Sequence, residues 1–408
     1  MDNDNRFVTG LDVGTENVRA VIASVNKSGE VSIVGYNEGK SQGMRKGIPA
    51  NLTGPAESID KMLGDAERMG GYDVRNAFVS INGSTVISTN TEGMIAVGPV
   101  DHEISDEDLD RVEDVAVTGR IPANRDVLDV VPLEYALDGQ GGIKDPIGMS
   151  GARLEMRACV VSALSPNCEN LRRATATADV KAEKLIPSVI AAARAVLTER
   201  QKENGVAVID MGAATTSVAV YEEGDLQYVG VVPAGSNNIT NDLAIVLAID
   251  PDLAEEIKTR FITGDFDTDK SPAIKVGKEE RTFDRKEVET VAKARLEEIF
   301  NEIRKKLKAA KYDQRLPEGI ILTGGGAKMR DIDLFAKKIL EASVKIGKAQ
   351  GLNGVADAVE KPEFATAVGL ALFASESLGQ NPAGHKKSTK SSKSAKKPGL
   401  IKRIFSKF

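Results

Sequence analysis

The chain has 408 residues, with 54 Lys and Arg against 60 Asp and Glu, for a formal net charge of -6. At roughly 150 residues per domain, this length predicts two or three domains. Two cysteines and two histidines argue against a disulfide framework, a Cys- or His-based zinc site and a Ser-His-Asp hydrolase. No apolar run approaches the roughly 18 residues that a membrane span needs.

The first predicted element is a hairpin at residues 6–25, and its pattern returns at 205–224. Each copy has a β-branched strand, an Asp-x-Gly turn and a second β-rich strand. Small turn residues let backbone N–H groups approach an anion. Hydroxyl donors also stand at the turns: Thr15, Thr215 and Thr216. Asp12 and Asp210 end their strands, where a carboxylate could hold the water shell of Mg²⁺. The repeat predicts two related half-domains facing one cleft.

Three further elements follow along the chain. Ser105 with Asp108 is typical of a helix N-cap with a capping-box variant, so the acidic run there is mostly a solvated helix start. Residues 285–308 predict a helix with one buried stripe. Its members are Val288, Val291, Ala292, Leu296, Ile299, Ile303 and Leu307. At 319–330 an apolar strand runs into three glycines, which could press flat against a planar ligand or a phosphate, or could form only a strand-to-helix turn.

The C-terminal residues 380–408 differ from the rest of the chain. They contain nine Lys and Arg and no acidic residue. The rest of the chain therefore has a formal net charge of -15 (-6 minus 9). Residues 380–398, rich in Ser and Lys, predict a disordered linker. Residues 399–408 read GLIKRIFSKF, with an apolar face and a basic face at helical spacing. The apolar face holds Leu400, Ile401, Ile404, Phe405 and Phe408, and the basic face includes Lys402, Arg403 and Lys407.

This terminal segment is too short to cross a bilayer, but it could fold in the plane of a membrane interface. Each Lys or Arg near an anionic surface contributes about 1 kcal/mol. A helix docked on the protein's own core and a nucleic-acid contact are the alternatives. The long polar linker disfavours the first, and the large apolar residues disfavour the second. We therefore expect a reversible membrane anchor, which needs several copies of the chain acting together to stay bound to the membrane. We expect no nucleic-acid partner.

The order of these elements resembles the actin-like ATPases, an α/β fold with two halves around a nucleotide cleft. The block at 130–155 narrows the resemblance to the cell-division family FtsA. The matching residues there are Pro132, Glu134, Tyr135, Asp138, Gly142, Ile143, Asp145, Pro146, Gly148, Gly151, Arg153 and Leu154. The family also has the hairpin motif GLDVGTENV, the turn LTGGGA and a C-terminal amphipathic helix. The resemblance covers nearly the whole chain.

The resemblance implies a site for ATP and Mg²⁺. Asp210, and more weakly Asp12, would be catalytic, and both would hold Mg²⁺ through water. The nucleotide contacts would be Gly14, Thr15, Gly212, Ala213, Ala214, Thr215, Thr216, Gly235, Glu255, Lys258, Gly324, Gly325 and Gly326. Glu255 and Lys258 fall on one helix face, where a solvated ion pair is the alternative.

The resemblance also implies a domain plan. Residues 6–83 with 163–200 form the first half (IA), and 84–162 form the FtsA-specific subdomain (IC). Residues 201–242 with 309–379 form the second half (IIA), and 243–308 form subdomain IIB. The linker at 380–398 and the membrane helix at 399–408 complete the chain.

Several positions depart from the family pattern. Ala213 and Ala214 replace turn glycines, and they would be strained if φ had to be positive. Ser217 replaces an Asp, and Ser236 replaces a Gly. Asn17 replaces a Lys, and Ile186 stands where MreB-like ATPases have a Glu that orients water. We therefore expect ATP binding with weak or absent hydrolysis.

The function implied is a cell-division scaffold at the cytoplasmic face of the membrane, peripheral, at the septum. It would self-associate, tether FtsZ filaments through the FtsZ C-terminal peptide at Arg295 and Glu298, and recruit later division proteins. For Arg295 and Glu298 the alternative is a solvated i, i+3 pair. Two other functions stay open: a PilM-like pilus-assembly adaptor, which the small-residue turn GAATTS also fits, and a small-molecule kinase of the same superfold.

Overall fold

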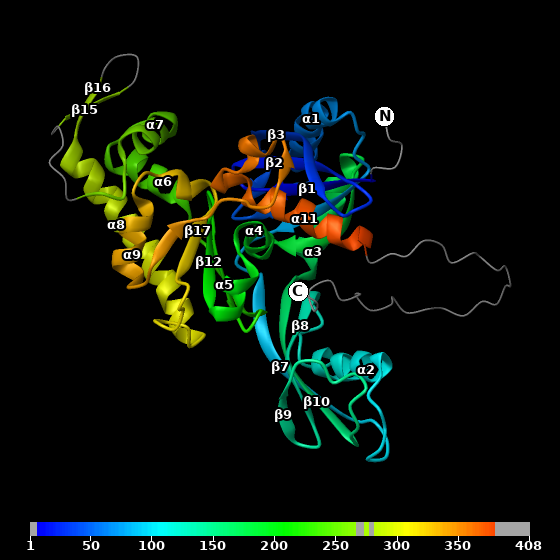
Figure 1. The fold of residues 1–408 in the computed structure, drawn as a ribbon. Helices are drawn as coiled ribbons and strands as arrows, with labels where there is room; N and C mark the ends of the chain where they lie inside the picture. Colours follow the sequence, from blue (N-terminus) through cyan, green and yellow to red (C-terminus); the bar gives the residue numbers. More distant parts are fainter. Residues whose placement is uncertain (1–5, 267–272, 277–280, 380–408) are drawn as a thin grey trace.

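A computed structural model describes residues 6–266, 273–276 and 281–379. The basic tail, including the predicted linker and membrane helix, lies outside these residues. Within them, no helix combines the length and apolar character needed to cross a bilayer. Figure 1 shows two α/β lobes side by side and a smaller unit that extends from them.

The first lobe is built on a six-stranded sheet of order β11-β6-β1-β2-β3-β19. The strands are β1 (Arg6–Val13), β2 (Asn17–Val25), β3 (Val31–Lys40), β6 (Asn76–Ile81), β11 (Lys181–Pro187) and β19 (Asn353–Gly354). The helices are α1 (Thr53–Gly70), α3 (Ser165–Thr177), α4 (Ser188–Val196) and α11 (Ala365–Gly379), with α10 (Ala356–Val359) nearby. Helix α1 packs on β2 and β3, and α11 packs on β1 and α4. Burial of these apolar faces gives the lobe its core.

The second lobe holds a five-stranded sheet of order β14-β13-β12-β17-β18. The strands are β12 (Val206–Met211), β13 (Thr216–Glu222), β14 (Asp225–Val232), β17 (Ile320–Thr323) and β18 (Val344–Ile346). The helices are α5 (Glu199–Asn204), α6 (Ser236–Val246), α7 (Pro251–Phe261), α8 (Arg285–Ala309) and α9 (Ile332–Leu340). The apolar stripe predicted for 285–308 is confirmed, because α8 buries all its members except the half-buried Val291.

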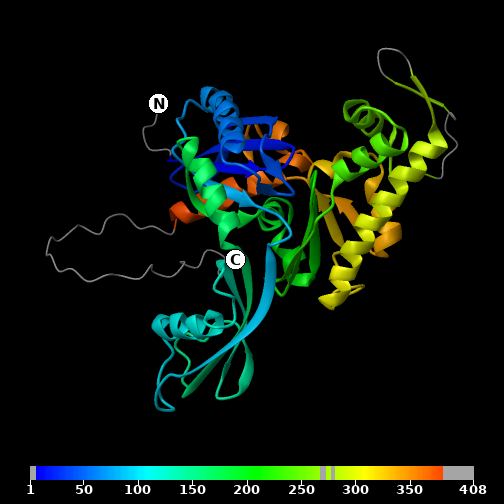
Figure 2. The ribbon, with the colours of Figure 1, turned by 180° about the vertical axis from the view of Figure 1, so that it is seen from behind.

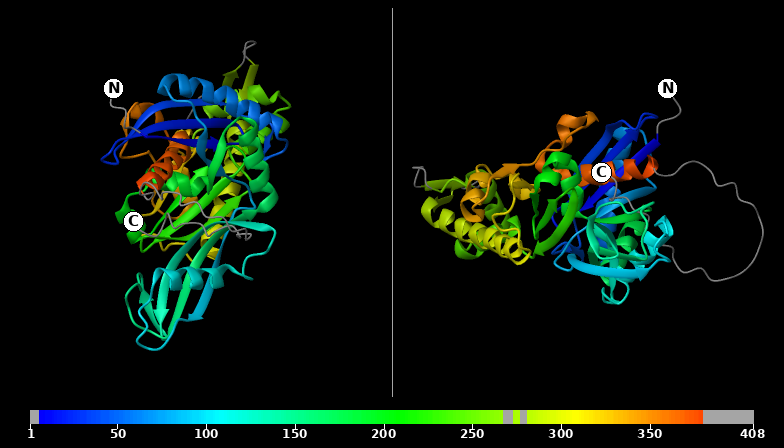
Figure 3. Two further views of the ribbon diagram at one scale, coloured as in Figure 1. Left: turned by 90° about the vertical axis from the view of Figure 1, so that its right-hand side faces the viewer. Right: turned by 60° about the horizontal axis from the view of Figure 1, so that its bottom comes forward.

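A four-stranded sheet of order β7-β10-β8-β9 forms the third unit, which we call the insert (residues 83–164). Its strands are β7 (Ile87–Ala96), β8 (Arg125–Leu137), β9 (Gln140–Ile143) and β10 (Arg153–Leu164), and its helix is α2 (Asp106–Val117). The insert has its own apolar core and extends away from both lobes (Figures 2 and 3). The predicted capping box is confirmed, since Ser105 and Asp108 exchange hydrogen bonds at the start of α2.

Short elements complete the described chain: β4 (Met44–Arg45), β5 (Ile48–Pro49), β15 (Ala273–Val276), β16 (Arg281–Asp284) and two 3₁₀ turns, η1 (Gly325–Lys328) and η2 (Pro362–Phe364).

The end of the described chain returns to the first lobe, which differs from the domain plan. We assigned 309–379 to the second half, but β19 pairs with β3 and α11 packs against α4 and β1. Helix α11 is apolar nearly all round, and its residues from Ala365 to Ala374 are almost all buried. Such a helix must lie between other elements, and the first lobe provides that position.

Candidate functional site

A cavity of about 560 Å³ lies between the two lobes. Its walls come from the β1–β2 turn, the β12–β13 turn, the start of α6, helix α7 and the glycine turn at η1. Most of the predicted cofactor residues line it. They are Gly14, Thr15, Gly212, Ala213, Ala214, Thr215, Glu255, Lys258, Gly324, Gly325 and Gly326, with Asp12 and Asp210 at the same cavity.

The first hairpin turn is closed by its own backbone. The Gly14 N–H donates to the Asn17 carbonyl at 3.0 Å. The Thr15 hydroxyl accepts a hydrogen bond of 2.9 Å from the Gly47 N–H. This contact holds the Thr15 side chain in place beside the cavity and leaves its own proton available to another acceptor.

The second turn repeats this arrangement, and its two alanines are not strained. The Gly212 N–H donates to the Thr215 carbonyl at 2.9 Å. Ala213 and Ala214 are not among the residues with positive φ, so a β-carbon fits at both positions. Strain at these two alanines would require a left-handed backbone, and neither residue has one.

Two of the predicted cofactor residues, Thr216 and Gly235, are not part of the cavity wall. The Thr216 side chain is fully buried, and its hydroxyl donates to the Ala234 carbonyl at 2.8 Å. A β-carbon on Gly235 would lie 2.5 Å from the Gly212 carbonyl oxygen. Gly235 therefore lets the start of α6 approach the second turn closely.

Asp12 and Asp210 bring two carboxylates to the base of the cavity. The Asp12 carboxylate accepts a hydrogen bond of 2.7 Å from Ser80 and lies 3.9 Å from the Arg19 guanidinium. Burial raises the pKa of Asp12. Burial, and then the negative charge of Asp12, raise the pKa of Asp210 to about 6. Two buried carboxylates whose pKa values are raised, one of them partly by the charge of the other, would be stabilised by a cation.

The glycine turn packs directly against Asp210. Gly324 has φ of 86°, and a β-carbon there would collide with an Asp210 carboxylate oxygen. A β-carbon on Gly326 would lie 2.5 Å from the Met211 side chain, whereas one on Gly325 would meet nothing within 4 Å. Gly324 and Gly326 are therefore required by the packing, and Gly325 leaves open space.

On α7, the buried Lys258 forms a network with the half-exposed Glu255. Lys258 is 7% exposed and lies 2.6 Å from the Glu255 carboxylate. Its ammonium donates to the Thr240 hydroxyl at 2.9 Å, and Thr240 donates to Glu255 at 2.5 Å. A buried lysine held in this way presents a fixed positive charge to the cavity.

Sequence reasoning missed the side chains that join the two lobes. Glu16, in the first turn, accepts hydrogen bonds from Lys40 at 2.6 Å and from Asn237 at 2.8 Å. Asn237 lies in the first turn of α6, in the other lobe. Ser217 donates to Asn82 at 3.2 Å, again between the lobes. The only sequence feature that could have predicted these long-range contacts is the presence of Glu and Asn in the turn motifs.

The structure shows where two of the residues that depart from the family pattern lie relative to the cavity. Ile186 is 2% exposed at the end of β11 and is not part of the cavity wall. No carboxylate therefore comes from this position to orient a water. Asn17 does line the cavity, and the nearest cation on the same strand is Arg19, which also lines it.

The residues present fit a nucleoside triphosphate with its metal. Backbone turns, two buried carboxylates and the charges of Arg19, Lys40 and Lys258 surround one space. Among the described residues no group of three or more His, Cys, Asp and Glu side chains could hold a metal unaided. Mg²⁺ usually keeps several waters and takes one or two carboxylates plus phosphate oxygens. The site would therefore take the metal together with the nucleotide.

Arg295 and Glu298 lie on α8, outside the cavity. Arg295 donates to both carboxylate oxygens of Asp242 on α6, at 2.6 and 3.1 Å. It also donates to Glu298 at 2.5 Å. The i, i+3 pair therefore forms, but the bidentate bond to Asp242 ties α8 to α6 more strongly.

Comparison with known sequences identifies the family. A family described as "Cell division protein FtsA" matches residues 207–369, and one described as "SHS2 domain inserted in FTSA" matches 83–162. The chain is 32% identical to cell division protein FtsA of Pseudomonas aeruginosa over 374 residues, which cover 90% of this chain and 89% of that protein. It is 30% identical to the Escherichia coli protein over 387 residues, with 92% and 91% covered.

Solved structures agree on the fold. A PilM–PilN type IV pilus biogenesis complex matches with a TM-score of 0.67 at 18% identity, over 90% of this chain and 98% of that one. MreB5 of Spiroplasma citri, bound to ADP, matches with a TM-score of 0.56 at 13% identity, over 92% and 99%. The fold is thus that of the actin-like ATPases, as expected, with an SHS2 insertion. With the sequence relatives, these findings show that the chain belongs to the FtsA family of cell-division proteins.

Proposed function

We propose that the chain is an ATP-binding scaffold that tethers FtsZ filaments to the cytoplasmic face of the membrane at the septum. The observation that carries the proposal is the cavity between the lobes, where paired hairpin turns set Asp12 and Asp210 side by side. Membership of a cell-division family supports the choice of partner.

In this proposal ATP and Mg²⁺ bind in the cavity and hold the lobes together. The bound group would supply polyphosphate charge and a divalent metal. Asp12 and Asp210 would hold the metal through water. The turn N–H groups, Lys258 and Arg19 would face the anion, and the open space at Gly325 would take the adenosine. Hydrolysis is expected to be slow because Ile186 brings no carboxylate to the cavity.

Attachment to the membrane would come from residues 399–408. One short amphipathic helix binds weakly, and self-association would bring many copies to one surface. The insert is the proposed surface for self-association and for later division proteins. The remainder of the chain carries a net charge of -15 (-6 minus 9). Anionic lipid would therefore repel this part of the chain and attract only the basic tail.

The proposed partner surface for the FtsZ C-terminal peptide lies at Arg295 and Glu298 on α8. Its test is peptide binding to the full chain by fluorescence anisotropy. Arg295→Gln should weaken binding about tenfold or more, as expected for loss of a charge-assisted contact. Arg304→Gln is the matched control, because Arg304 lies on the same helix and pairs instead with Glu341 and Asp313.

Equal weakening in both variants would contradict the assignment, as would unchanged binding in Arg295→Gln. A circular dichroism spectrum of each variant must match the wild type, since Arg295 also ties α8 to Asp242. Binding of a PilN peptide in place of the FtsZ peptide would favour the pilus-assembly alternative.

A further inference from the structure

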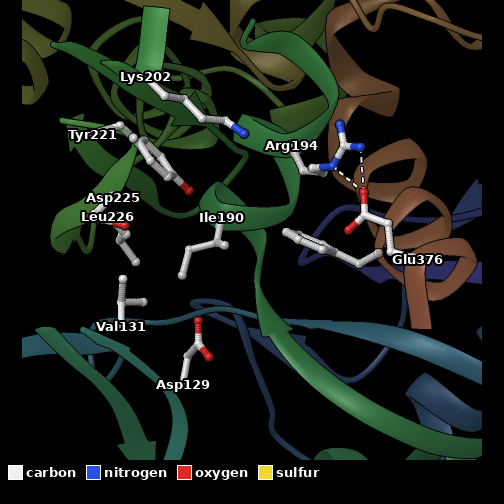
Figure 4. A pocket seen from close by; sticks show the side chains of 11 residues that line it. Asp129, Val131, Ile190, Arg194, Lys202, Tyr221, Asp225, Leu226 and Glu376 are labelled. Carbon is white, nitrogen blue, oxygen red and sulfur yellow. Dashed lines mark hydrogen bonds and ion pairs between the residues drawn. The ribbon is translucent and has the colours of Figure 1, made fainter. Parts of the chain in front are cut away.

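A second cavity lies apart from the cleft, where the insert meets both lobes (Figure 4). Its walls come from β8 of the insert, from α4 and α11 of the first lobe, and from α5 and the β13–β14 hairpin of the second. The cavity measures about 50 Å³. At roughly 10–15 Å³ per water-sized group, it holds about three to five such groups.

Asp129, on β8, is the distinctive residue of this cavity. It is 7% exposed, and its Oδ2 atom has no hydrogen-bond partner among the described residues. Figure 4 shows its carboxylate pointing into the cavity. Burial raises the pKa of Asp129 to about 7, although the positive charge of Lys184 and the Val130 N–H act in the opposite direction. These two groups therefore do not compensate the burial of the carboxylate.

The other charged groups of the cavity are already paired. Arg194 lies 2.5 Å from Glu376, Lys202 lies 2.8 Å from Glu199, and Asp225 lies 2.8 Å from Lys144. The second Glu376 oxygen, Oε2, is buried without a hydrogen-bond partner among the described residues. Among the described residues that line the cavity, the unsatisfied polar side-chain atoms, on Asp129 and Glu376, are both acceptors, and the Lys184 ammonium is not part of the wall. A group that complements them must donate hydrogen bonds, and a cation does so most strongly.

Apart from the Tyr221 hydroxyl, the remaining side chains of the wall are apolar. Val131, Ile190, Leu226 and Phe373 are buried and line the space between the charged groups. In Figure 4, Ile190 lies between Asp129 and the Arg194–Glu376 pair. Such walls favour alkyl carbons over a purely hydrated ion. A ligand that fits this cavity therefore combines a cationic hydrogen-bond donor with a short hydrocarbon chain.

We propose that this cavity binds a small alkylammonium ion of about two to four non-hydrogen atoms, with its N–H groups on Asp129 and its carbons against Val131, Ile190 and Phe373. The site is separate from the cleft between the lobes and does not depend on nucleotide binding. Because the insert and both lobes supply its walls, a bound ion would tie the insert to the lobes.

Propylammonium chloride is the probe, titrated into the full chain by isothermal titration calorimetry, with thermal unfolding followed by circular dichroism. We expect a dissociation constant on the order of millimolar, since so few atoms contribute, and a melting temperature that rises with the logarithm of concentration. Neutral propan-1-ol, sodium chloride at equal ionic strength, and tetramethylammonium, which lacks N–H donors, should give no such rise.

Asp129→Asn should weaken binding about tenfold or more, because an amide replaces the charged acceptor. Asp126→Asn is the matched control. Asp126 lies on the same strand and pairs with Arg172 outside the cavity, so this variant should bind like the wild type. If Asp129→Asn does not fold, Val131→Leu reduces the space without changing any charge and should also weaken binding.

Three results would overturn the proposal. They are an equal effect of propan-1-ol or sodium chloride, unchanged affinity in both Asp129→Asn and Val131→Leu, and no binding at about 100 mM probe, well above the expected millimolar constant. ATP affinity should be the same in Asp129→Asn as in the wild type.

Discussion

Replacing Asp210 by Asn should stabilise the protein without ligand and remove its response to Mg²⁺. The carboxylate is 7% exposed, and burial together with Asp12 raises its pKa from 3.8 to about 6. A shift of about two units corresponds to about 3 kcal/mol of destabilisation at neutral pH. Asparagine has nearly the same shape and no charge, so up to this amount should be recovered.

The sign of the pH dependence follows from the raised pKa. The unfolded chain loses the Asp210 proton near pH 3.8, but the folded protein keeps it until about pH 6. The stability contributed by this protonated group is therefore full below about pH 4 and is lost as the pH rises through 6. The gain from Asp210→Asn should be absent at pH 4 and complete at pH 7, with a rise in melting temperature on the order of 5 °C.

Thermal unfolding measured from pH 4 to pH 8 in EDTA, and again at pH 7 with Mg²⁺ and ATP, tests this reasoning. The wild type should gain stability from Mg²⁺ with ATP, and Asp210→Asn should lose the part that depends on the metal. Asp110→Asn is the control, because Asp110 is an exposed carboxylate on α2. A variant less stable than the wild type at pH 7, or one that keeps the full response to Mg²⁺, would refute the argument.

Four further substitutions test other parts of the structure. Gly325→Ala should leave the melting temperature within about 1 °C, since its β-carbon meets nothing, yet lower ATP affinity in calorimetry. Gly324→Ala should destabilise the fold by about 1–3 kcal/mol in urea unfolding, because of its positive φ. Ser105→Ala should reduce stability by about 1 kcal/mol in the same assay through loss of the cap. Asn237→Ala should speed hydrogen exchange around Glu16, because the bond between the lobes is lost.

Local patterns in the sequence predicted much of the fold. The hairpin turns at Asp12 and Asp210, the capping box at Ser105 and the apolar stripe of α8 all follow from residues near each other in the chain. The glycine turn was also predicted, because an apolar strand leads directly into it. In each case the determining interactions are short-range, so their periodicity or turn chemistry is visible in the sequence.

Long-range contacts could not be predicted in this way. The Glu16–Asn237 bond joins residues 221 positions apart, and the return of α11 to the first lobe depends on which apolar faces remain uncovered. Whether Ala213 and Ala214 are strained also could not be predicted, because the residue types alone do not fix φ at a turn. The uncompensated burial of Asp129 depends on packing between three parts of the chain.

The most direct test of the central claim is co-flotation of FtsZ filaments with anionic vesicles in the presence of ATP and Mg²⁺. The full chain should carry FtsZ into the lipid fraction, and a chain ending at residue 379 should leave FtsZ in the protein fraction. Equal flotation with both chains would contradict the tether, as would a full chain that floats without FtsZ.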